Sequence, residues 1–411
     1  MIVYHGGGYV GLTGAVHFAL AGIPTTIYDP DPQVVKGIQA GIPRAGDFLE
    51  YLHADVARLV GEGVLSATPR FEDVRDCDTH IIAVPTEKGG KPDDALVKRV
   101  LKRLDAEAPA GALFICESTL MPGTVDALLP DLSGFNDIAV CPRRDWFADP
   151  TKNLRTLPRI VGGVTPEATA RAVGTLRAVS DTILETDYRT AEIVKSLENA
   201  LLHQQVMLVH QLAWVFPDRD IAEAVRLATT HWRLTPLFLG AGSGGRCVPL
   251  GSEYLLTSSH GKLGMAQAAL EWDAAHRSIL AGLCAKHGRR VLVLGAAYRP
   301  DFRDAGRSPG VDIARILHET GADVAIADPL WKLEDLGELA KVPATNAYKA
   351  AVYDVVFLAT PHTEWRNLPF LVNWHRGQTL IDAQGAWRQY RGHFEAHGVK
   401  YIQVGQAGWT H

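Results

Sequence analysis

The chain has 411 residues, in which 41 lysines and arginines stand against 46 aspartates and glutamates, for a net charge of −5. This length predicts two or three domains with full hydrophobic cores, and the charge gives no sign of nucleic-acid binding. The 47% of hydrophobic residues is typical of globular proteins, and no apolar run approaches the ~20 residues of a membrane helix.

The cysteines are odd in number, widely spaced and without a CxxC pair: Cys77, Cys116, Cys141, Cys247 and Cys284. This pattern argues against a disulfide scaffold and a zinc site, so we expect no metal and a reducing, cytoplasmic environment. The apolar start has a run of glycines and no Lys or Arg before residue 23, so a signal peptide is not expected.

The N-terminal segment predicts a strand, a glycine-rich turn, a helix and a second strand. The apolar run Met1–Tyr4 precedes the glycines, a helical pattern ends near Gly22, and Thr25–Tyr28 is rich in β-branched residues. Further apolar runs, at 80–84, 113–116 and 138–141, alternate with helical stretches. Such alternation predicts a parallel sheet covered by helices.

A long helix is predicted next, from Tyr188 to about Val215, because this segment has no Gly or Pro and Pro217 follows it. At ~1.5 Å per residue it is too long for one layer of a small domain, so we interpret it as a connector. The helical region continues to about Leu283.

A second alternating pattern follows, with strands expected at 291–294, 324–327, 354–359 and 379–381 and a helix at 311–320. The sequence thus predicts an α/β protein with two doubly wound, Rossmann-like parallel-sheet domains joined by the long helix and a helical region. The expected domain boundaries are 1–180, 181–285 and 286–411.

The N-terminal glycines match the dinucleotide-binding pattern GxGxxG at Gly6, Gly8 and Gly11. The pattern follows a strand, opens a helix and is completed by Asp29 at the end of the next strand, which is the context that makes it informative. An acidic residue there can accept hydrogen bonds from a ribose diol and repels a 2′-phosphate. NAD is therefore the expected cofactor, against the alternative of a glycine turn without a ligand.

A second glycine-rich segment runs from Gly240 to Pro249 and contains Cys247. Glycines allow the backbone to approach a ligand closely. A lone cysteine is more often a small buried hydrophobe, but four glycines and an arginine beside Cys247 favour a reactive thiol.

These motifs resemble, in order, those of the UDP-glucose/GDP-mannose dehydrogenase family. The similar segments are Gly6–Leu12, Val84–Thr86, Glu117–Thr124, Pro158–Gly163, Ala191-Glu192 with Lys195 and Asn199, the loop ending at Cys247, Gly295–Pro309, and Thr360 with His362. The resemblance implies an enzyme that oxidises the C6 alcohol of a nucleotide-linked sugar to a carboxylate with two NAD⁺. Loop spacing is closest to the UDP-N-acetylhexosamine branch.

The resemblance also implies roles for individual residues. Cys247 is the expected nucleophile, which forms a thiohemiacetal and then a thioester. Lys195 and Asn199, on one helix face, are expected to stabilise the oxyanion, and Thr119 to order the water. The expected cofactor-binding residues are Gly6, Gly8, Tyr9, Val10, Gly11, Asp29, Val84, Pro85, Thr86, Glu117, Ser118 and Arg307. The expected substrate-binding residues are Arg143, Arg144, Arg233, Gly242, Gly244, Gly245, Tyr298 and Arg299. A homodimer formed through the central helices is expected, with Arg233 reaching the neighbouring substrate.

The chain departs from the family pattern at positions to which the resemblance gives a catalytic role. Gly251 stands where the family has an Asp that assists water, and Arg143 stands where it has a Glu. Asp145 or Glu253 could supply the missing carboxylate. Without one, thioester hydrolysis should be slow, since a general base contributes ~10²–10⁴-fold.

Other departures concern charge. Gly306 replaces a phosphate-binding Arg, Arg307 replaces a Glu and could take over that role, and Arg246 replaces a His or Ser. His210-Gln211 replaces an Asn-Glu pair. Two further hypotheses therefore stay open beside the 6-dehydrogenase. One is a related enzyme that oxidises another nucleotide-linked alcohol and could stop at the aldehyde or transfer the acyl group, and the other is an inactive nucleotide-binding protein.

Overall fold

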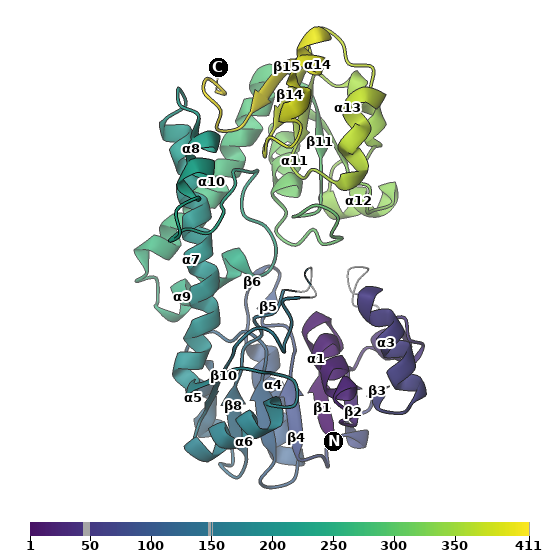
Figure 1. The fold of residues 1–411 in the computed structure, drawn as a ribbon, viewed down its shortest axis with the longest axis vertical. Coiled ribbons are helices and arrows are strands. Elements are labelled where there is room, and N and C mark those ends of the chain that lie inside the picture. The colour runs from purple at the N-terminus through teal and green to yellow at the C-terminus, as the bar shows by residue number, and fades with distance from the viewer. Residues whose placement is uncertain (44–49, 147–148, 150, 411) are drawn as a thin grey trace. The chain divides into compact units, whose positions relative to one another are not determined.

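The computed structural model describes residues 1–43, 50–146, 149 and 151–410 (Figure 1). The chain divides into two compact units, Met1–Glu198 with Glu253–Lys262, and Asn199–Ser252 with Leu263–His411. Each unit contains one large sheet covered by helices, which confirms the predicted α/β class.

The first unit is built on a sheet of eight strands in the order β10-β9-β8-β7-β4-β1-β2-β3. The strands are β1 (Ile2–His5), β2 (Thr25–Tyr28), β3 (Leu65–Thr68), β4 (Thr79–Ile82), β7 (Leu113–Cys116), β8 (Asp137–Val140), β9 (Arg159–Gly163) and β10 (Ile183–Asp187). All neighbours pair in parallel except β8 with β9. β1 and β7 are buried along their whole length, as expected for central strands covered on both faces.

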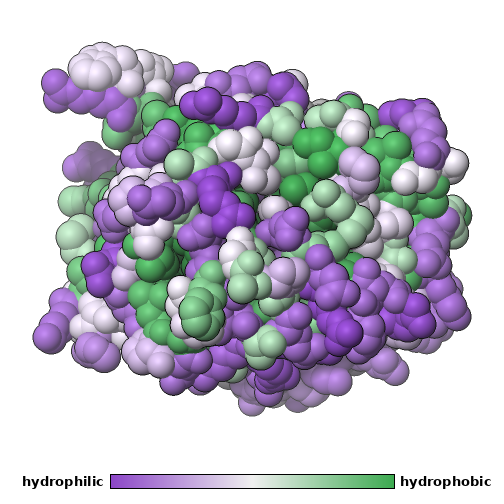
Figure 2. Space-filling model, turned by 90° about the horizontal axis from the view of Figure 1, so that it is seen from below, coloured by the Kyte–Doolittle hydropathy of each residue, from purple (hydrophilic) through white to green (hydrophobic). Residues whose placement is uncertain are grey.

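Helices cover this sheet, and a short hairpin of β5 (Glu87–Lys88) and β6 (Lys91–Pro92) projects beyond β4. The helices are α1 (Tyr9–Leu20), α2 (Pro32–Gln39), α3 (Glu50–Gly61), α4 (Ala95–Glu107), α5 (Thr124–Leu128) and α6 (Pro166–Leu176). Alternate side chains of β1 enter different core layers: Ile2 and Tyr4 pack with α1, and Val3 packs with α4. Hydrophobic groups on the face drawn in Figure 2 are separated by hydrophilic residues.

The central helices are α7 (Tyr188–Val215), α8 (Ile221–Ala228), α9 (Val248–Ser258) and α10 (Gly264–His287). The bounds of α7 are those predicted from the absence of Gly and Pro. Within the described ranges, no helix is long and apolar enough to cross a bilayer.

The second unit has a parallel sheet in the order β12-β11-β13-β14-β15. Its strands are β11 (Arg290–Leu294), β12 (Asp323–Ala327), β13 (Val355–Leu358), β14 (Thr379–Asp382) and β15 (Lys400–Gln403), and its helices are α11 (Pro309–Glu319), α12 (Leu333–Ala340), α13 (Leu368–Leu371) and α14 (Arg391–Ala396). α10 and α11 pack on one face of this sheet, where Leu280 and Ile313 join its core.

Candidate active site

The glycine-rich turn between β1 and α1 has the geometry that a dinucleotide loop requires. Gly6 has a φ of +105°, and a Cβ on it would lie 2.6 Å from the carbonyl oxygen of Ala83. Gly11 lies against the Gly6 carbonyl, which a Cβ on Gly11 would approach to 1.8 Å. By contrast, nothing lies within 4 Å of a Cβ built on Gly8. The turn is therefore tightly packed at Gly6 and Gly11 and open at Gly8.

Asp29 completes this turn at the end of β2. One of its carboxylate oxygens accepts the N–H of Gly7 at 2.7 Å, and the other accepts the N–H of Asp31 at 2.9 Å. α1 begins after Gly8 with no side-chain cap and no acidic residue in its first turn. The N–H groups at a helix start favour a bound phosphate. The residues present therefore fit NAD: Gly6–Gly11 would hold the pyrophosphate and Asp29 the ribose.

Two neighbouring segments of the predicted cofactor site are held by side chains. Ser118 donates its hydroxyl to the carbonyl oxygen of Val84 at 2.7 Å. The Tyr254 hydroxyl lies 2.8 Å from the carbonyl oxygen of Thr86 and 2.7 Å from its Oγ1. Tyr254 is only 1% exposed. Sequence reasoning missed it, because a single tyrosine in α9 carries no pattern.

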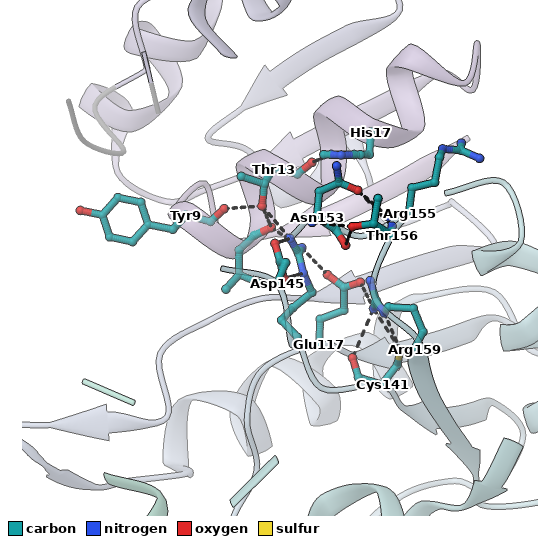
Figure 3. Close-up of polar contacts among 12 residues, drawn as sticks. Tyr9, Thr13, His17, Glu117, Cys141, Asp145, Asn153, Arg155, Thr156 and Arg159 are labelled. Carbon is teal, nitrogen blue, oxygen red and sulfur yellow. Dashed lines mark hydrogen bonds and ion pairs between the residues drawn. The ribbon is translucent and has the colours of Figure 1, made fainter. Parts of the chain in front are cut away.

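A buried ion-pair cluster lies beneath α1 (Figure 3). Glu117 accepts from Arg159 at 2.6 Å and from Arg143 at 3.0 Å, and Arg143 also pairs with Asp145 at 2.6 Å. All four side chains are at most 6% exposed. All five N–H donors of Arg143 are therefore bonded to acceptors of the protein, and none is left for a substrate. Glu117 and Asp145 are in turn paired with arginines.

The predicted residues of α7 lie beside Arg144. Arg144 donates to Glu198 at 2.6 Å and to the carbonyl oxygen of Pro158 at 2.7 Å, and Lys195 lies 3.7 Å from the same glutamate. Lys195 is 16% exposed and Arg144 26%. These cations are therefore partly accessible, while the neighbouring Asn199 is 9% exposed.

Glu192, one turn before Lys195, holds the segment that carries Thr119. Its two carboxylate oxygens accept the N–H groups of Gly123 at 2.7 Å and Val125 at 2.9 Å. Burial raises the pKa of Glu192 to about 7 in spite of these bonds. The family-like pair Ala191-Glu192 thus has a structural task in this chain.

Cys247 differs from the other cysteines in exposure and position. It is exposed and immediately precedes α9, whose fourth residue, Gly251, donates its N–H to the Cys247 carbonyl at 3.0 Å. Burial raises the pKa of Cys116 to about 12 and also raises that of Cys284. Cys247 is thus an exposed cysteine at a helix start, whereas Cys116, Cys141 and Cys284 are buried.

The loop before Cys247 is fixed by polar side chains of α7 and α10. Gly240 donates its N–H to Nε2 of His210, and its carbonyl accepts from Nε2 of His276, each at 2.9 Å. Asp273 accepts the Ser243 N–H at 2.9 Å and pairs with Arg277 at 2.6 Å. His210, which was identified only as a departure from the family pattern, thus supports the cysteine loop.

The glycines nearest Cys247 pack on Tyr298. A Cβ on Gly244 would lie 2.7 Å from the Tyr298 Cβ, and one on Gly245, whose φ is +81°, would lie 2.9 Å from its ring. Burial raises the pKa of Tyr298 to about 12. The predicted Gly244, Gly245 and Tyr298 are therefore brought together with Cys247.

Arg246 lies beside Gly306, the position at which the family has an arginine. A Cβ on Gly306 would lie 3.1 Å from the Cγ of Arg246, whose side chain is 61% exposed. Arg307 follows with a φ of +51°. Arg233, by contrast, lies on the ring of Trp232, with its Cζ 4.9 Å from the ring centroid.

In the second unit, Gly310 packs against the backbone of Gly295 as Gly11 packs against that of Gly6 in the first unit. Gly295 has a φ of +109°, and a Cβ on Gly310 would lie 2.0 Å from its carbonyl oxygen. Asp328 accepts the N–H of Ala296 at 2.7 Å and a bond from His362 at 3.0 Å. Thr360 donates its hydroxyl to the Ala297 carbonyl oxygen at 2.7 Å, so Thr360 and His362 both brace this loop, and the Asp328 side chain is 0% exposed.

Among the described residues, no cluster of three or more His, Cys, Asp or Glu side chains could hold a metal ion.

The chain matches three segments of one family in order. Residues 1–179 match the NAD binding domain of the UDP-glucose/GDP-mannose dehydrogenase family, residues 189–274 its central domain, and residues 292–389 its UDP binding domain. The chain is 29% identical to a UDP-N-acetyl-D-mannosamine dehydrogenase of Pyrococcus horikoshii, over 92% of this chain and 93% of that protein. It is 25% identical to a UDP-N-acetyl-D-glucosamine 6-dehydrogenase of Pseudomonas aeruginosa, over 88% and 90%.

A solved structure of the UDP-D-ManNAc dehydrogenase of Pyrococcus horikoshii superposes with a TM-score of 0.86 at 25% identity, covering 99% of this chain and all of that one. The solved UDP-glucose dehydrogenase of Pyrobaculum islandicum, at 23% identity and a TM-score of 0.84 over 99% and 98%, shares the fold. With its site geometry and all three domain types in order, the chain belongs to the UDP-glucose/GDP-mannose dehydrogenase family of NAD-dependent oxidoreductases.

Proposed function

We propose that this chain oxidises the C6 alcohol of a UDP-linked N-acetylhexosamine to the carboxylate in the cytoplasm. The observation that carries the proposal is Cys247, an exposed thiol at the start of α9 in a loop that two histidines hold. The names of the relatives, which act on UDP-N-acetylmannosamine and UDP-N-acetylglucosamine, support the substrate class.

The chemistry assigns each residue a task. When bound, NAD⁺ would supply the hydride acceptor, with one NAD⁺ consumed in each of the two oxidations. After the first, the Cys247 thiolate adds to the C6 aldehyde, and the new C–S bond leaves a hydroxyl once the oxygen takes a proton. Loss of a second hydride and of that proton gives a thioester. Water then adds, the C–S bond breaks, and the thiolate and the carboxylate are released. The Lys195 ammonium and the Asn199 amide would stabilise the negative oxygen of each addition, and Thr119 would orient the water.

A second outcome is favoured by the buried ion-pair cluster. Arg143 occupies the place of a family carboxylate, and Asp145 and Glu117 are both bound to it. Release of the thioester by water would then be slow, and another nucleophile could take the acyl group.

Counting NADH separates these outcomes. Two NADH per carboxylate support the 6-dehydrogenase, and two NADH with an acyl group on Cys247, or transferred from it, support the second outcome. One NADH per aldehyde shows that oxidation stops early. No NADH with any UDP-, GDP-, CDP- or TDP-sugar would contradict both. A Cys247→Ala variant that still makes carboxylate at the wild-type rate would exclude the thioester route.

We also propose that the chain forms a homodimer through α7. Ile193, Leu197, Leu201, Leu208 and Val215 follow one another at spacings of four and seven residues and are 43% to 59% exposed. Such an apolar stripe on a helix calls for burial. Sedimentation should give a dimer, and a fully active monomer would contradict this.

A further inference from the structure

We infer that Arg143 is a positioning residue for the dinucleotide: it fixes the first turn of α1, whose N–H groups would face the pyrophosphate. The inference rests on the NAD-binding role of the first unit. It replaces the expectation that Arg143 binds substrate, because its five N–H donors all have acceptors within the unit.

Arg143 bonds directly to the first turn of α1. Nη1 of Arg143 donates to the Val10 carbonyl and Nη2 to the Thr13 hydroxyl oxygen, both at 2.7 Å. The Thr13 hydroxyl in turn donates to the carbonyl oxygen of Tyr9 at 2.7 Å. One guanidinium thus holds the Val10 carbonyl and the Thr13 hydroxyl, three residues apart in the opening turn of α1, and Thr13 passes the contact on to Tyr9 (Figure 3).

Arg143 is itself anchored by two carboxylates. Its Nε and Nη2 donate to the two Asp145 oxygens at 2.7 and 2.6 Å, and its Nη1 donates to Glu117 at 3.0 Å. Glu117 follows β7, and Asp145 lies in the segment after β8. Arg143 therefore ties α1 to two neighbouring loops at the same edge of the sheet. A planar guanidinium can make these bonds in several directions at once, and a lysine cannot.

Binding of the dinucleotide would depend on the direction of the N–H groups in this turn. α1 has no side-chain cap, and a Cβ on Gly8 would meet nothing within 4 Å, so the N–H groups of the turn are its polar feature toward a ligand. Bonds to a bound anion depend on donor direction, and a small rotation of the turn weakens several together.

The test compares Arg143→Lys with Arg159→Lys. Arg159 is equally buried and shares Glu117, but its other polar contact is Cys141 and not α1. Calorimetric titration of NAD⁺ should show at least about tenfold weaker binding for Arg143→Lys and unchanged binding for Arg159→Lys. Without NAD⁺, amide hydrogen exchange at residues 9–13 should be faster in Arg143→Lys alone.

Thr13→Val provides a milder second variant, because it removes one acceptor of Arg143 on α1 with little change in volume. It should weaken NAD⁺ binding in the same direction, and it keeps the inference testable if Arg143→Lys does not fold. Wild-type binding and exchange in the Arg143 or Thr13 variants would overturn the inference and leave the cofactor assignment intact. Failure of the wild-type protein to bind NAD⁺ would overturn both.

Discussion

His210 and His276 bind opposite sides of one residue, Gly240, and their rings lie 4.4 Å apart. His210 accepts the Gly240 N–H through Nε2, so that nitrogen carries no proton. His276 accepts the Trp214 indole N–H through Nδ1 at 2.9 Å, so its proton is on Nε2, which donates to the Gly240 carbonyl. Two neutral imidazoles with defined tautomers therefore fix the entry to the loop that carries Cys247.

Replacing His276 should loosen this loop. His276→Phe keeps a ring but loses the bonds to Gly240 and Trp214, so we expect kcat to fall by about tenfold or more. The rate at which iodoacetamide alkylates Cys247 should change as well. His276→Gln, which can still donate and accept, should recover part of the loss. Leu336→Ala, a fully buried change in the same core, is the control: it should lower stability without changing the alkylation rate.

Stability should depend on pH because of the same pair. Burial lowers the pKa of His210 to about 3 and that of His276 to about 4, whereas both would titrate near 6.5 in the unfolded chain. Between these values the unfolded state binds more protons, so the free energy of unfolding should fall as pH drops from about 6.5 to about 4, by up to about 1.4 kcal/mol per unit for each histidine. Denaturant titrations at pH 7, 6 and 5 should show a shallower fall for His276→Gln. An unchanged slope would contradict the assignment.

The order of elements could be predicted from local patterns, and the missed strands show the limit. α7 is predicted with its observed bounds because only its apolar spacing and its lack of Gly and Pro are needed. β9 (Arg159–Gly163) ends in two glycines, and β15 (Lys400–Gln403) begins with an exposed lysine, so neither stands out as a buried run. Both strands are defined by pairing with a strand on the other side of a helix in the chain, β10 for β9 and β14 for β15.

Residues of the candidate site can be predicted where they belong to one continuous motif. Contacts between segments that only folding brings together cannot be predicted in this way. Gly6, Gly11 and Asp29 meet as their spacing implies. The pairing of Arg143 with Glu117 joins loops after different strands, so the sequence indicates a lost carboxylate at 143 but not the ion pair that replaces it. His210 likewise acquires its task only once α7 and the cysteine loop meet.

The close backbone contacts Gly6–Gly11 and Gly295–Gly310 allow a matched pair of variants. A Cβ on Gly11 would lie 1.8 Å from the Gly6 carbonyl oxygen, and one on Gly310 would lie 2.0 Å from that of Gly295. Backbone must move in either case, at a cost of about 1–3 kcal/mol or more. Gly11→Ala should abolish NAD⁺ binding and spare nucleotide-sugar binding, and Gly310→Ala should do the reverse. Thermal shifts with each ligand measure both, and equal loss of both ligands in one variant would contradict separate sites.

Gly245 lies two residues before Cys247, in a backbone conformation that favours glycine. Its φ of +81° disfavours any residue with a side chain, and a Cβ there would lie 2.9 Å from the ring of Tyr298. Gly245→Ala should therefore move the backbone two residues before Cys247, because the half-buried Tyr298 ring packs directly against that position. We expect kcat to fall by about 10²-fold, since a displacement of ~1 Å in a reacting group has that effect.

Gly282 is the matched control for Gly245. It lies inside α10, nothing is within 4 Å of its Cβ position, and its φ is not positive. Gly282→Ala should therefore stabilise the chain by about 0.4–1 kcal/mol and leave kcat unchanged. Wild-type activity in Gly245→Ala would show that the glycine loop tolerates displacement, and Cys247 would then need no fixed approach to its substrate.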